Sequence, residues 1–384
     1  MKEKSVGIVK TQHFKFAEPP HELKLECGEK LGPITLAYET YGELNADRSN
    51  AVLILHALSG DAHAAGFYHA DDKYSGWWDT MIGPGKAFDT DKYFVICSNI
   101  LAGCKGSTGP SSINTKTNKP YALEFPIISI QDMVDCQKHL IDYLGIEKLL
   151  TVTGGSMGGM QALSWLVRYP ERIRSAIPIA TALKHSSQQI AFDEVGRQAI
   201  MADSNWKEGN YYGGLPPAKG LAVARMIGHI TYMSDQSMEE KFGREKKKEA
   251  RPFKFTADFE VEGYLKYRGE HFVKRFDANS YLYITKAMDN FNLLEGRTIQ
   301  TLFKGIKAKL LVVAFKSDWL YPAYQSKEIV KASKLAGLEA TYCEIDSTYG
   351  HDAFLLETEE ETHLIKNFLK KVFYEYGATG KYGS

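Results

Sequence analysis

The spacing of apolar residues changes along the chain, and each change predicts a different kind of structure. Residues 22–27 alternate between polar and apolar side chains, and residues 34–41 form a second short apolar segment after a Gly-Pro turn. Alternation with period two is typical of a strand with one buried and one solvated face. We therefore expect two antiparallel strands near the start of the chain.

Short, continuously apolar runs follow, as expected of parallel strands that are covered on both faces. Four such runs are present, at residues 51–55, 93–97, 149–153 and 175–180. Ser129 and Asp132 have the spacing of a capping box, with Asp in place of the usual Glu, and they open a predicted helix that Gly145 ends. Strands that alternate with helices predict a mostly parallel sheet with helices on both faces.

A different pattern occupies about residues 184–296, where aromatic and charged residues are mixed and no run typical of a parallel strand occurs. Helical spacing is visible there at residues 221–233 and 280–294. Strands and helices then alternate again, at residues 308–315, 323–336, 340–345 and 357–376. The pattern predicts an α/β core made of residues 1–183 and 297–384, with residues 184–296 inserted as a helical cap.

Composition and charge argue against several classes of protein. The 384 residues include 47 Lys and Arg against 47 Asp and Glu, so the basic excess of most nucleic-acid-binding or membrane-surface proteins is missing. A basic cluster at residues 244–248 has glutamates beside it, which favours a solvated surface. No apolar run approaches the ~18 residues of a membrane helix, and no signal-peptide core follows the first residues. Five scattered cysteines without CxxC spacing favour free thiols, so we expect a cytoplasmic protein.

The sequence GGSMGG at residues 154–159 is the strongest chemical signal, because it places Gly-x-Ser-x-Gly between a predicted strand and a helix that runs to about residue 169. A nucleophile elbow requires this context, since its sharp turn exposes the serine hydroxyl at the end of the sheet. The following helix directs its N-terminus at developing negative charge. Phosphate binding is the weaker alternative, since neither the dinucleotide nor the P-loop glycine pattern is present. We predict that Ser156 is a nucleophile.

A serine nucleophile needs a base, and the base needs an acid that orients it. In folds with this elbow they follow the serine in the order Asp or Glu, then His. Asp318 and His351 each come just after a predicted strand, where open α/β sheets place their sites. Asp346 and Asp352 are rival acids, but Asp352 adjoins the histidine and Asp346 ends the strand that leads to it. We predict a triad of Ser156, Asp318 and His351.

The oxyanion formed during acyl transfer needs two backbone donors. The N–H of Met157, directly after the nucleophile, supplies one, and the loop HALSGD at residues 56–61 should supply the other, for which we choose Leu58. The alternative for this part of the chain is a metal site at His56, Asp61, His63 and His69. Because this spacing matches neither HExxH nor a facial triad, we predict no metal.

Four motifs resemble those of homoserine O-acetyltransferases: GGSMGGMQAL at residues 154–163, NILAGCKGSTGPSS at 99–112, HALSGD at 56–61 and YGHDAFL at 349–355. The Gly-Ser-Thr-Gly-Pro loop is far more specific than the elbow, because ordinary esterases lack it. The resemblance extends from about residue 10 to 375. Through it the chain is identified as a member of that family, which has the α/β-hydrolase fold with an inserted helical cap.

The resemblance implies transfer of an acetyl group from acetyl-CoA to L-homoserine, early in methionine biosynthesis, by a ping-pong route through an acyl-serine. It also implies a homodimer that pairs through the helical cap, and an active site at the end of a tunnel. Acetyl-CoA is then a co-substrate, and no bound cofactor is expected.

The resemblance further assigns substrate-binding roles to individual residues. Arg225 corresponds to the arginine that binds the substrate carboxylate, Asp352 to the acid that holds the substrate amine, and Tyr232 to a tyrosine that lines the site. A zwitterionic amino acid requires such a cation and such an anion. Ser59 stands where many members have threonine, so a hydroxyl is kept, and Ala102 stands where glycine is more usual.

The residues leave other activities open. Succinyl-CoA in place of acetyl-CoA, or serine in place of homoserine, would use the same triad. A carboxylesterase would use it without an amino acid, and a binding protein on the same fold would not use it at all. The intact order of Ser156, Asp318 and His351 argues against the binding protein.

Overall fold

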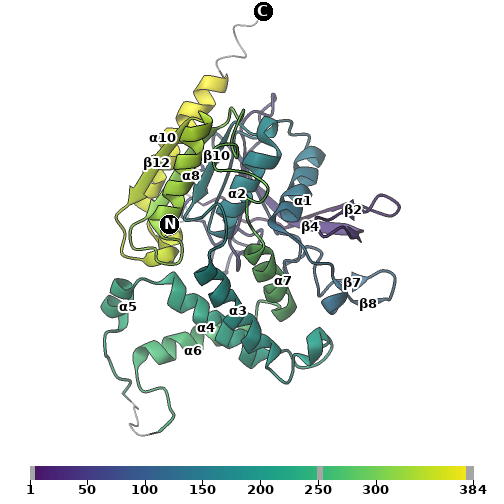
Figure 1. The fold of residues 1–384 in the computed structure, drawn as a ribbon, viewed down its shortest axis with the longest axis vertical. Helices are drawn as coiled ribbons and strands as arrows, with labels where there is room; N and C mark the ends of the chain where they lie inside the picture. The colour runs from purple at the N-terminus through teal and green to yellow at the C-terminus, as the bar shows by residue number, and fades with distance from the viewer. Residues whose placement is uncertain (1–4, 249–253, 378–384) are drawn as a thin grey trace, which may run out of the picture.

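The computed structural model describes residues 5–248 and 254–377, and its centre is an eight-stranded sheet (Figure 1). The strands lie in the order β1-β4-β6-β5-β9-β10-β11-β12. Strand β4 pairs antiparallel with β1 and β6, and all the other neighbours are parallel. The bounds are Gln12–Phe16 for β1, Ile34–Tyr41 for β4, Ala51–Ile54 for β5, Phe94–Ser98 for β6, Thr151–Gly155 for β9, Ser175–Ile179 for β10, Lys309–Phe315 for β11 and Ala340–Ile345 for β12.

Side chains of the central strands pack alternately into two apolar cores, one on each face of the sheet. On β5, Leu53 belongs to one core, Val52 and Ile54 belong to the other, and all three are fully buried. Residues of α1 (Ile130–Tyr143), α2 (Met157–Arg168) and α8 (Ala323–Ala336) are among those that join the first core, and residues of α10 (Thr358–Gly377) are among those that join the second. This burial on both faces produces the continuous apolar runs of the sequence and confirms the predicted parallel sheet.

The first predicted strand is antiparallel, as expected, but it is shorter than predicted and lies outside the main sheet. Residues 22–27 contribute only Leu23–Lys24 (β2), which pairs with Lys30–Leu31 (β3) in a small hairpin outside the main sheet. The chain reverses between them at Gly28, which has a φ of 91° and donates its N–H to Leu25 O at 2.9 Å. The edge strand of the sheet is instead β1, which the sequence pattern missed because most of its side chains are exposed.

The described residues of segment 184–296 are mostly helical and lie at one end of the sheet, at the bottom of Figure 1. Helix α4 packs between α3 and α6, while α7 is almost wholly buried against the rest of the chain. Their bounds, with those of α5, are Ser187–Met201 for α3, Ala218–Tyr232 for α4, Asp235–Phe242 for α5, Glu260–Val273 for α6 and Ala278–Asp289 for α7. The helices predicted at 221–233 and 280–294 thus correspond to α4 and α7, whereas the boundaries of the cap stay a prediction.

The remaining strands and helices of the described ranges are short. They are β7 (Ile113–Asn114), β8 (Lys119–Pro120), η2 (Ala122–Glu124), η3 (Pro170–Arg172), η4 (Lys207–Gly209), η5 (Gly350–Asp352) and α9 (Ala353–Leu356). Within the same ranges, no helix is both long and apolar enough to cross a membrane.

Candidate active site

Ser156 occupies a strained turn between β9 and α2. Its φ of 59° and ψ of −122° lie in a region that non-glycine residues rarely adopt, and its N–H donates to Ile179 O at 2.9 Å. The turn is tight because its glycines touch the end of β5. A Cβ on Gly154 or on Gly158 would lie 2.1 or 2.0 Å from Leu55 O. The sequence GGSMGG therefore folds into the predicted elbow and presents the serine side chain at the carboxyl end of the sheet.

Asp318 and His351 meet in the loops after β11 and β12. His351 Nδ1 lies 2.7 Å from Asp318 Oδ2, and both side chains are buried. The other carboxylate oxygen, Oδ1, accepts the backbone N–H groups of Leu320 and Tyr321 at 3.0 and 2.8 Å. Since a carboxylate only accepts hydrogen bonds, His351 Nδ1 carries the hydrogen and Nε2 is left free to act as a base. The structure thus gives Asp318 and His351 the arrangement of an acid and a base.

Tyr321, which the sequence analysis did not single out, contacts the predicted triad at three points. Its ring stacks on His351, with centroids 5.0 Å apart, and its N–H holds Asp318. Burial raises the pKa of its hydroxyl well above the ordinary value, and an interaction with the Ser156 side chain opposes the rise. Among the hydrogen bonds of the described residues, none joins Ser156 directly to His351. No motif marks Tyr321, and only its place three residues after Asp318 hints at its position.

The predicted oxyanion donors lie beside the serine. Met157 is the first residue of α2, and Leu58 lines the same pocket as Ser156. Within the described ranges, neither backbone N–H donates to a protein acceptor. Two unpaired N–H groups next to a nucleophile, one of them at a helix N-terminus, are suited to hold a developing negative charge.

Arg225 and Tyr232 reach the site from α4. The Arg225 guanidinium donates to Ser59 Oγ at 3.2 Å and lies over the rings of Phe272 and Tyr232, 4.8 and 5.6 Å from their centroids. Among the ion pairs of the described residues, Arg225 has no carboxylate partner. A half-buried cation without an anion is a candidate site for a substrate carboxylate.

Asp352 directly follows the candidate base and lies within reach of the same cation. Burial raises the pKa of this carboxyl group, while the charges of His351, Arg225 and Arg268 oppose the rise. A half-buried carboxylate next to Arg225 places an acceptor for an amine close to the site for a carboxylate. The two charges are suited to the two ends of an amino acid.

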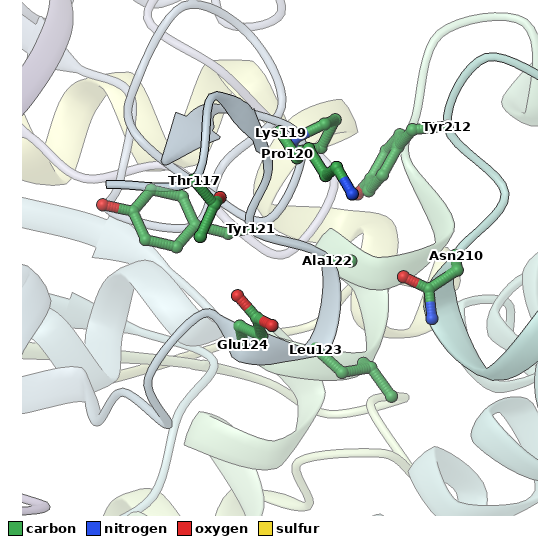
Figure 2. Close-up of a pocket in the computed structure, with 9 residues that line it drawn as sticks. All are labelled: Thr117, Lys119, Pro120, Tyr121, Ala122, Leu123, Glu124, Asn210 and Tyr212. Carbon is green, nitrogen blue, oxygen red and sulfur yellow. The ribbon is translucent and has the colours of Figure 1, made fainter. Parts of the chain in front are cut away.

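The pocket above Ser156 is narrow. It has a volume of about 40 Å³, and its walls come from the HALSGD loop, α3, α4, α7 and the loop after β11. A water molecule needs about 10–15 Å³ by this measure, so the pocket holds roughly three to four waters or a small acyl group. A larger open hollow of about 740 Å³ lies between residues 117–124 on one side and Asn210 and Tyr212 on the other (Figure 2). None of the predicted site residues lines that hollow.

The alternatives considered for individual residues have other partners. The rival acid Asp346 is exposed and pairs with Lys316 at 3.2 Å. In the possible metal site, His56 Nε2 accepts the N–H of Ile100, and His63 Nδ1 lies 3.0 Å from Glu39. Their side chains are therefore engaged within the protein.

Comparison with known proteins places this geometry in a family. A family model described as the alpha/beta hydrolase fold matches residues 50–358. A homoserine O-acetyltransferase from Methanohalobium evestigatum is 58% identical over 374 residues, which are 97% of this chain and 76% of that protein. The same name recurs among further relatives that are 54–58% identical over nearly the whole chain.

Solved structures give the same fold under two names. The homoserine O-acetyltransferase of Bacillus anthracis is 33% identical, with a TM-score of 0.87, over 94% of this chain and 98% of that one. Esterase E22 is 31% identical, with a TM-score of 0.85, over 94% of this chain and all of that one. The likeness therefore includes the helical segment as well as the sheet.

Proposed function

The chain belongs to the homoserine O-acetyltransferase family of α/β hydrolases, and from this premise we propose that it transfers an acetyl group from acetyl-CoA to the hydroxyl of L-homoserine. The observation that carries the proposal is the pairing of an elbow serine and a buried Asp318–His351 couple with the free charges of Arg225 and Asp352. The product would serve methionine biosynthesis.

In the first half-reaction, Ser156 Oγ attacks the thioester carbonyl while His351 Nε2 takes the serine proton. The negative charge that forms on the carbonyl oxygen is held by the N–H groups of Leu58 and Met157. The carbon–sulfur bond then breaks, the protonated histidine returns its proton to the sulfur, and coenzyme A leaves as the thiol. The acetyl group remains as an ester on Ser156.

In the second half-reaction, homoserine occupies the space that the thiol has left. Arg225 binds its carboxylate, Asp352 binds its ammonium group, and Tyr232 and Ser59 line the site. His351 removes the proton of the homoserine hydroxyl as the oxygen attacks the acetyl-serine, and then protonates Ser156 Oγ as it leaves. Water must be excluded during this step, and the narrow pocket closed by α3 and α4 supports that requirement.

The size of the pocket favours an acetyl donor, and the charge around it favours coenzyme A thioesters in general. The narrow space next to Ser156 suits an acetyl group better than the longer, charged succinyl group. Four cations from α4, α5, α6 and the following turn act together on the neighbouring His229, namely Arg225, Arg268, Lys241 and Arg275. Such a positive field attracts an anionic coenzyme A thioester as well as a carboxylate.

Acetyl-CoA is proposed as a co-substrate, and no resident cofactor or metal takes part in this scheme. We also propose that the protein works in the cytoplasm as a homodimer that pairs through helices of segment 184–296. The net charge of zero supports small-molecule substrates rather than nucleic acid or an anionic membrane surface.

Thiol release from purified protein tests the proposal directly. Acetyl-CoA and succinyl-CoA are each supplied with L-homoserine, with L-serine or with no acceptor. We expect release that requires homoserine and prefers acetyl-CoA. Ser156→Ala should lower turnover by a factor on the order of 10⁴ to 10⁶, because the members of a triad act as a unit. A preference for succinyl-CoA or serine would move the enzyme to a sister activity, and a Ser156→Ala variant with more than about a tenth of the activity would exclude Ser156 as the nucleophile.

Carboxylester hydrolysis is the second candidate, because a protein called esterase E22 shares the fold at 31% identity. Hydrolysis of p-nitrophenyl acetate with and without homoserine separates the two. An acyltransferase should form acetylhomoserine from the ester at the expense of acetate. Rapid acetate formation that homoserine does not reduce would favour the esterase.

A further inference from the structure

Three positively charged side chains near the candidate active site have no individual task in the proposed mechanism. They are Arg275, Arg268 and Lys241, and they lie close to Arg225, which is assigned to the carboxylate of the acceptor. The charges of all four, together with burial, lower the pKa of His229 to about 3. Among the ion pairs of the described residues, none of the four cations has a carboxylate partner.

The inner pair of these cations, Arg225 and Arg275, holds the loop that carries a predicted oxyanion donor. Arg225 donates to Ser59 Oγ at 3.2 Å, and Arg275 Nη1 donates to Ser59 O at 2.9 Å. Both guanidinium groups lie over the ring of Phe272, 4.8 and 5.3 Å from its centroid. Burial and then the charge of Arg225 lower the pKa of Arg275, so the two charges repel each other. Because Ser59 directly follows Leu58, this positive charge begins next to the oxyanion site.

The outer pair, Lys241 on α5 and Arg268 on α6, is exposed to solvent. Lys241 Nζ and Arg268 Cζ lie 4.6 and 5.2 Å from the centroid of the same Tyr264 ring. The Tyr264 hydroxyl lies 3.2 Å from Nδ1 of His229, which is one helical turn after Arg225 on α4. An aromatic ring attracts a cation but does not neutralise it. The outer pair therefore continues the positive charge of the pocket towards solvent.

The two substrates of the proposed reaction differ in the charge that they bring to these cations. Homoserine is a zwitterion, and Arg225 and Asp352 together match its two charges. A coenzyme A thioester is a polyanion, in which a long uncharged arm separates the phosphate groups from the sulfur. The pocket beside Ser156 has a volume of only about 40 Å³, so the phosphates must lie outside it when the thioester carbonyl reaches the serine. Cations at the surface beside the pocket are suited to bind them.

We propose that Lys241 and Arg268, together with Arg275, form a subsite for the phosphate groups of the coenzyme A donor. Lysine and arginine donate charge-assisted hydrogen bonds to phosphate oxygens. The subsite holds the donor by the end opposite its acyl group, so it contributes to binding, and no bond is made or broken there. The inference rests on the proposed function, since it names the part of the donor that this positive charge binds.

Carboxylates of a second subunit are the competing partners of the outer pair, because α5 and α6 belong to the segment through which the proposed homodimer pairs. However, the charge of Arg268 also acts on Asp352, the candidate amine-binding residue, and lowers its pKa against the effect of burial. The outer pair is thus close to the space for the substrates. This closeness favours a phosphate of the donor over a group of the partner.

Two acetyl thioesters test the subsite, because S-acetylpantetheine has the thioester and the arm of acetyl-CoA without the phosphates. In the double variant Lys241→Gln with Arg268→Gln, KM for acetyl-CoA should rise about tenfold while kcat changes by less than about twofold, since only binding contacts are lost. KM for S-acetylpantetheine should not change. An unchanged KM for acetyl-CoA would overturn the proposal, as would an equal rise in KM for both thioesters.

Lys266→Gln is the matched control. Lys266 is exposed on the same helix as Arg268, and its Nζ lies 4.0 Å from Glu270 Oε1. The control should keep both KM values, and a rise for acetyl-CoA as large as that of the double variant would show a general effect of surface charge instead of a subsite. Light scattering checks the competing partner. A double variant that loses half of its mass would assign Lys241 and Arg268 to the contact between subunits and overturn the subsite.

Binding of free coenzyme A separates this inference from the proposed function, because it requires neither homoserine nor acetyl transfer. Isothermal titration calorimetry should give a Kd about tenfold higher for the double variant than for the unmodified protein, whose own Kd should rise with added NaCl. If coenzyme A binds in this way but no acetyl group is transferred, the proposed function is wrong and the subsite stands. If acetyl transfer proceeds and the double variant binds coenzyme A normally, only the inference is wrong.

Discussion

Asp318 accepts three hydrogen bonds, two at Oδ1 from backbone N–H groups and one at Oδ2 from His351. A substitution that changes only the Oδ2 position therefore tests the triad specifically. In Asp318→Asn, the amide oxygen can still accept from Leu320 and Tyr321, which places the amide nitrogen against His351 Nδ1. That nitrogen donates, so the histidine must hold its hydrogen on Nε2 and can no longer accept the serine proton. We expect kcat to fall by about 10⁴ with little change in stability, measured by thiol release and thermal unfolding.

The rival acid provides the matched control for this change. Asp346 follows the same β12 strand as His351 but is exposed and pairs with Lys316. Asp346→Asn should therefore leave kcat within about twofold, because exposed ion pairs contribute little. A large loss in Asp346→Asn with normal turnover in Asp318→Asn would reverse the assignment of the acid.

The pKa of His229, which lies on α4, is lowered by its surroundings. Burial, followed by the charges of Arg225, Arg268, Lys241 and Arg275, lowers its pKa to about 3. Below about pH 6.5 the unfolded chain binds a proton at this position and the folded protein does not, so stability falls as the pH falls. The slope from this single group reaches about 1.4 kcal/mol per pH unit between its two pKa values.

Urea unfolding at pH 7.0, 6.0 and 5.0 measures this contribution. His229→Asn removes the titrating group and keeps an acceptor for the Tyr264 hydroxyl, which lies 3.2 Å from His229 Nδ1. We expect the variant to lose less stability than the unmodified protein on acidification. His271→Asn, at an exposed position of α6, is the control and should follow the unmodified protein. Parallel pH curves for His229→Asn and the unmodified protein would show that His229 is not held neutral.

At the level of elements, the elbow depends on the contact between α2 and the end of β5. A Cβ on Gly158 would lie 2.0 Å from Leu55 O and 2.9 Å from Leu55 C, which are backbone atoms and cannot rotate away. We expect Gly158→Ala to destabilise the fold by about 3 kcal/mol or more, and to lower activity because the same strand leads to the oxyanion loop at Leu58. Thermal unfolding and fluorophosphonate labelling measure the two effects.

Gly263, on α6, is the control position for Gly158→Ala. A Cβ there meets only the end of the flexible Lys247 side chain, at 2.1 Å from Nζ, so the neighbour can move. Gly263→Ala should be neutral or stabilising, by up to about 1 kcal/mol, because alanine favours a helix interior. Equal effects of the two alanines would indicate that the elbow tolerates a side chain at Gly158.

The success of sequence reasoning differed between elements for a physical reason. Strand β12 and helix α8 were predicted with their observed bounds, and the capping box of Ser129 and Asp132 is present. Burial of a strand on both faces and capping of a helix depend on residues that are neighbours in the sequence, so a short stretch of sequence is enough to predict them. Strand β1 was missed because an edge strand has only one neighbour and needs few apolar residues.

The site shows the same limit at the scale of the whole molecule. Asp318 and His351 were accessible to prediction, because strand ends and chain order constrain both. The contacts of His185, which lines the same pocket, were not, since His185 meets Tyr321 across 136 residues and Asp289 from a third segment, and no short motif joins them. Contacts between distant segments depend on how α3 and α7 pack, and the spacing of residues along the chain does not contain that information.

The arrangement of helices also bears on assembly. Helices α3, α4 and α6 carry exposed apolar side chains, which are Val195, Val223, Ile230 and Tyr267. Helix α4 packs against both α3 and α6, and exposed apolar side chains on packed helices can contribute to a protein interface. This distribution supports the proposed homodimer through segment 184–296, and predicts a particle of about twice the 43.1 kDa chain mass in light scattering.

Charge introduced on α4 should separate the two copies. In Val223→Glu with Ile230→Glu, two carboxylates would have to be buried without partners on each side of the interface, which costs far more than the apolar contact contributes. We expect this variant to scatter as a monomer while Ser156 still reacts with a fluorophosphonate. Tyr374→Glu, on α10 at the far end of the molecule in Figure 1, should remain a dimer. A monomeric unmodified protein would disprove the homodimer, and a double variant that stays dimeric would place the interface away from α4.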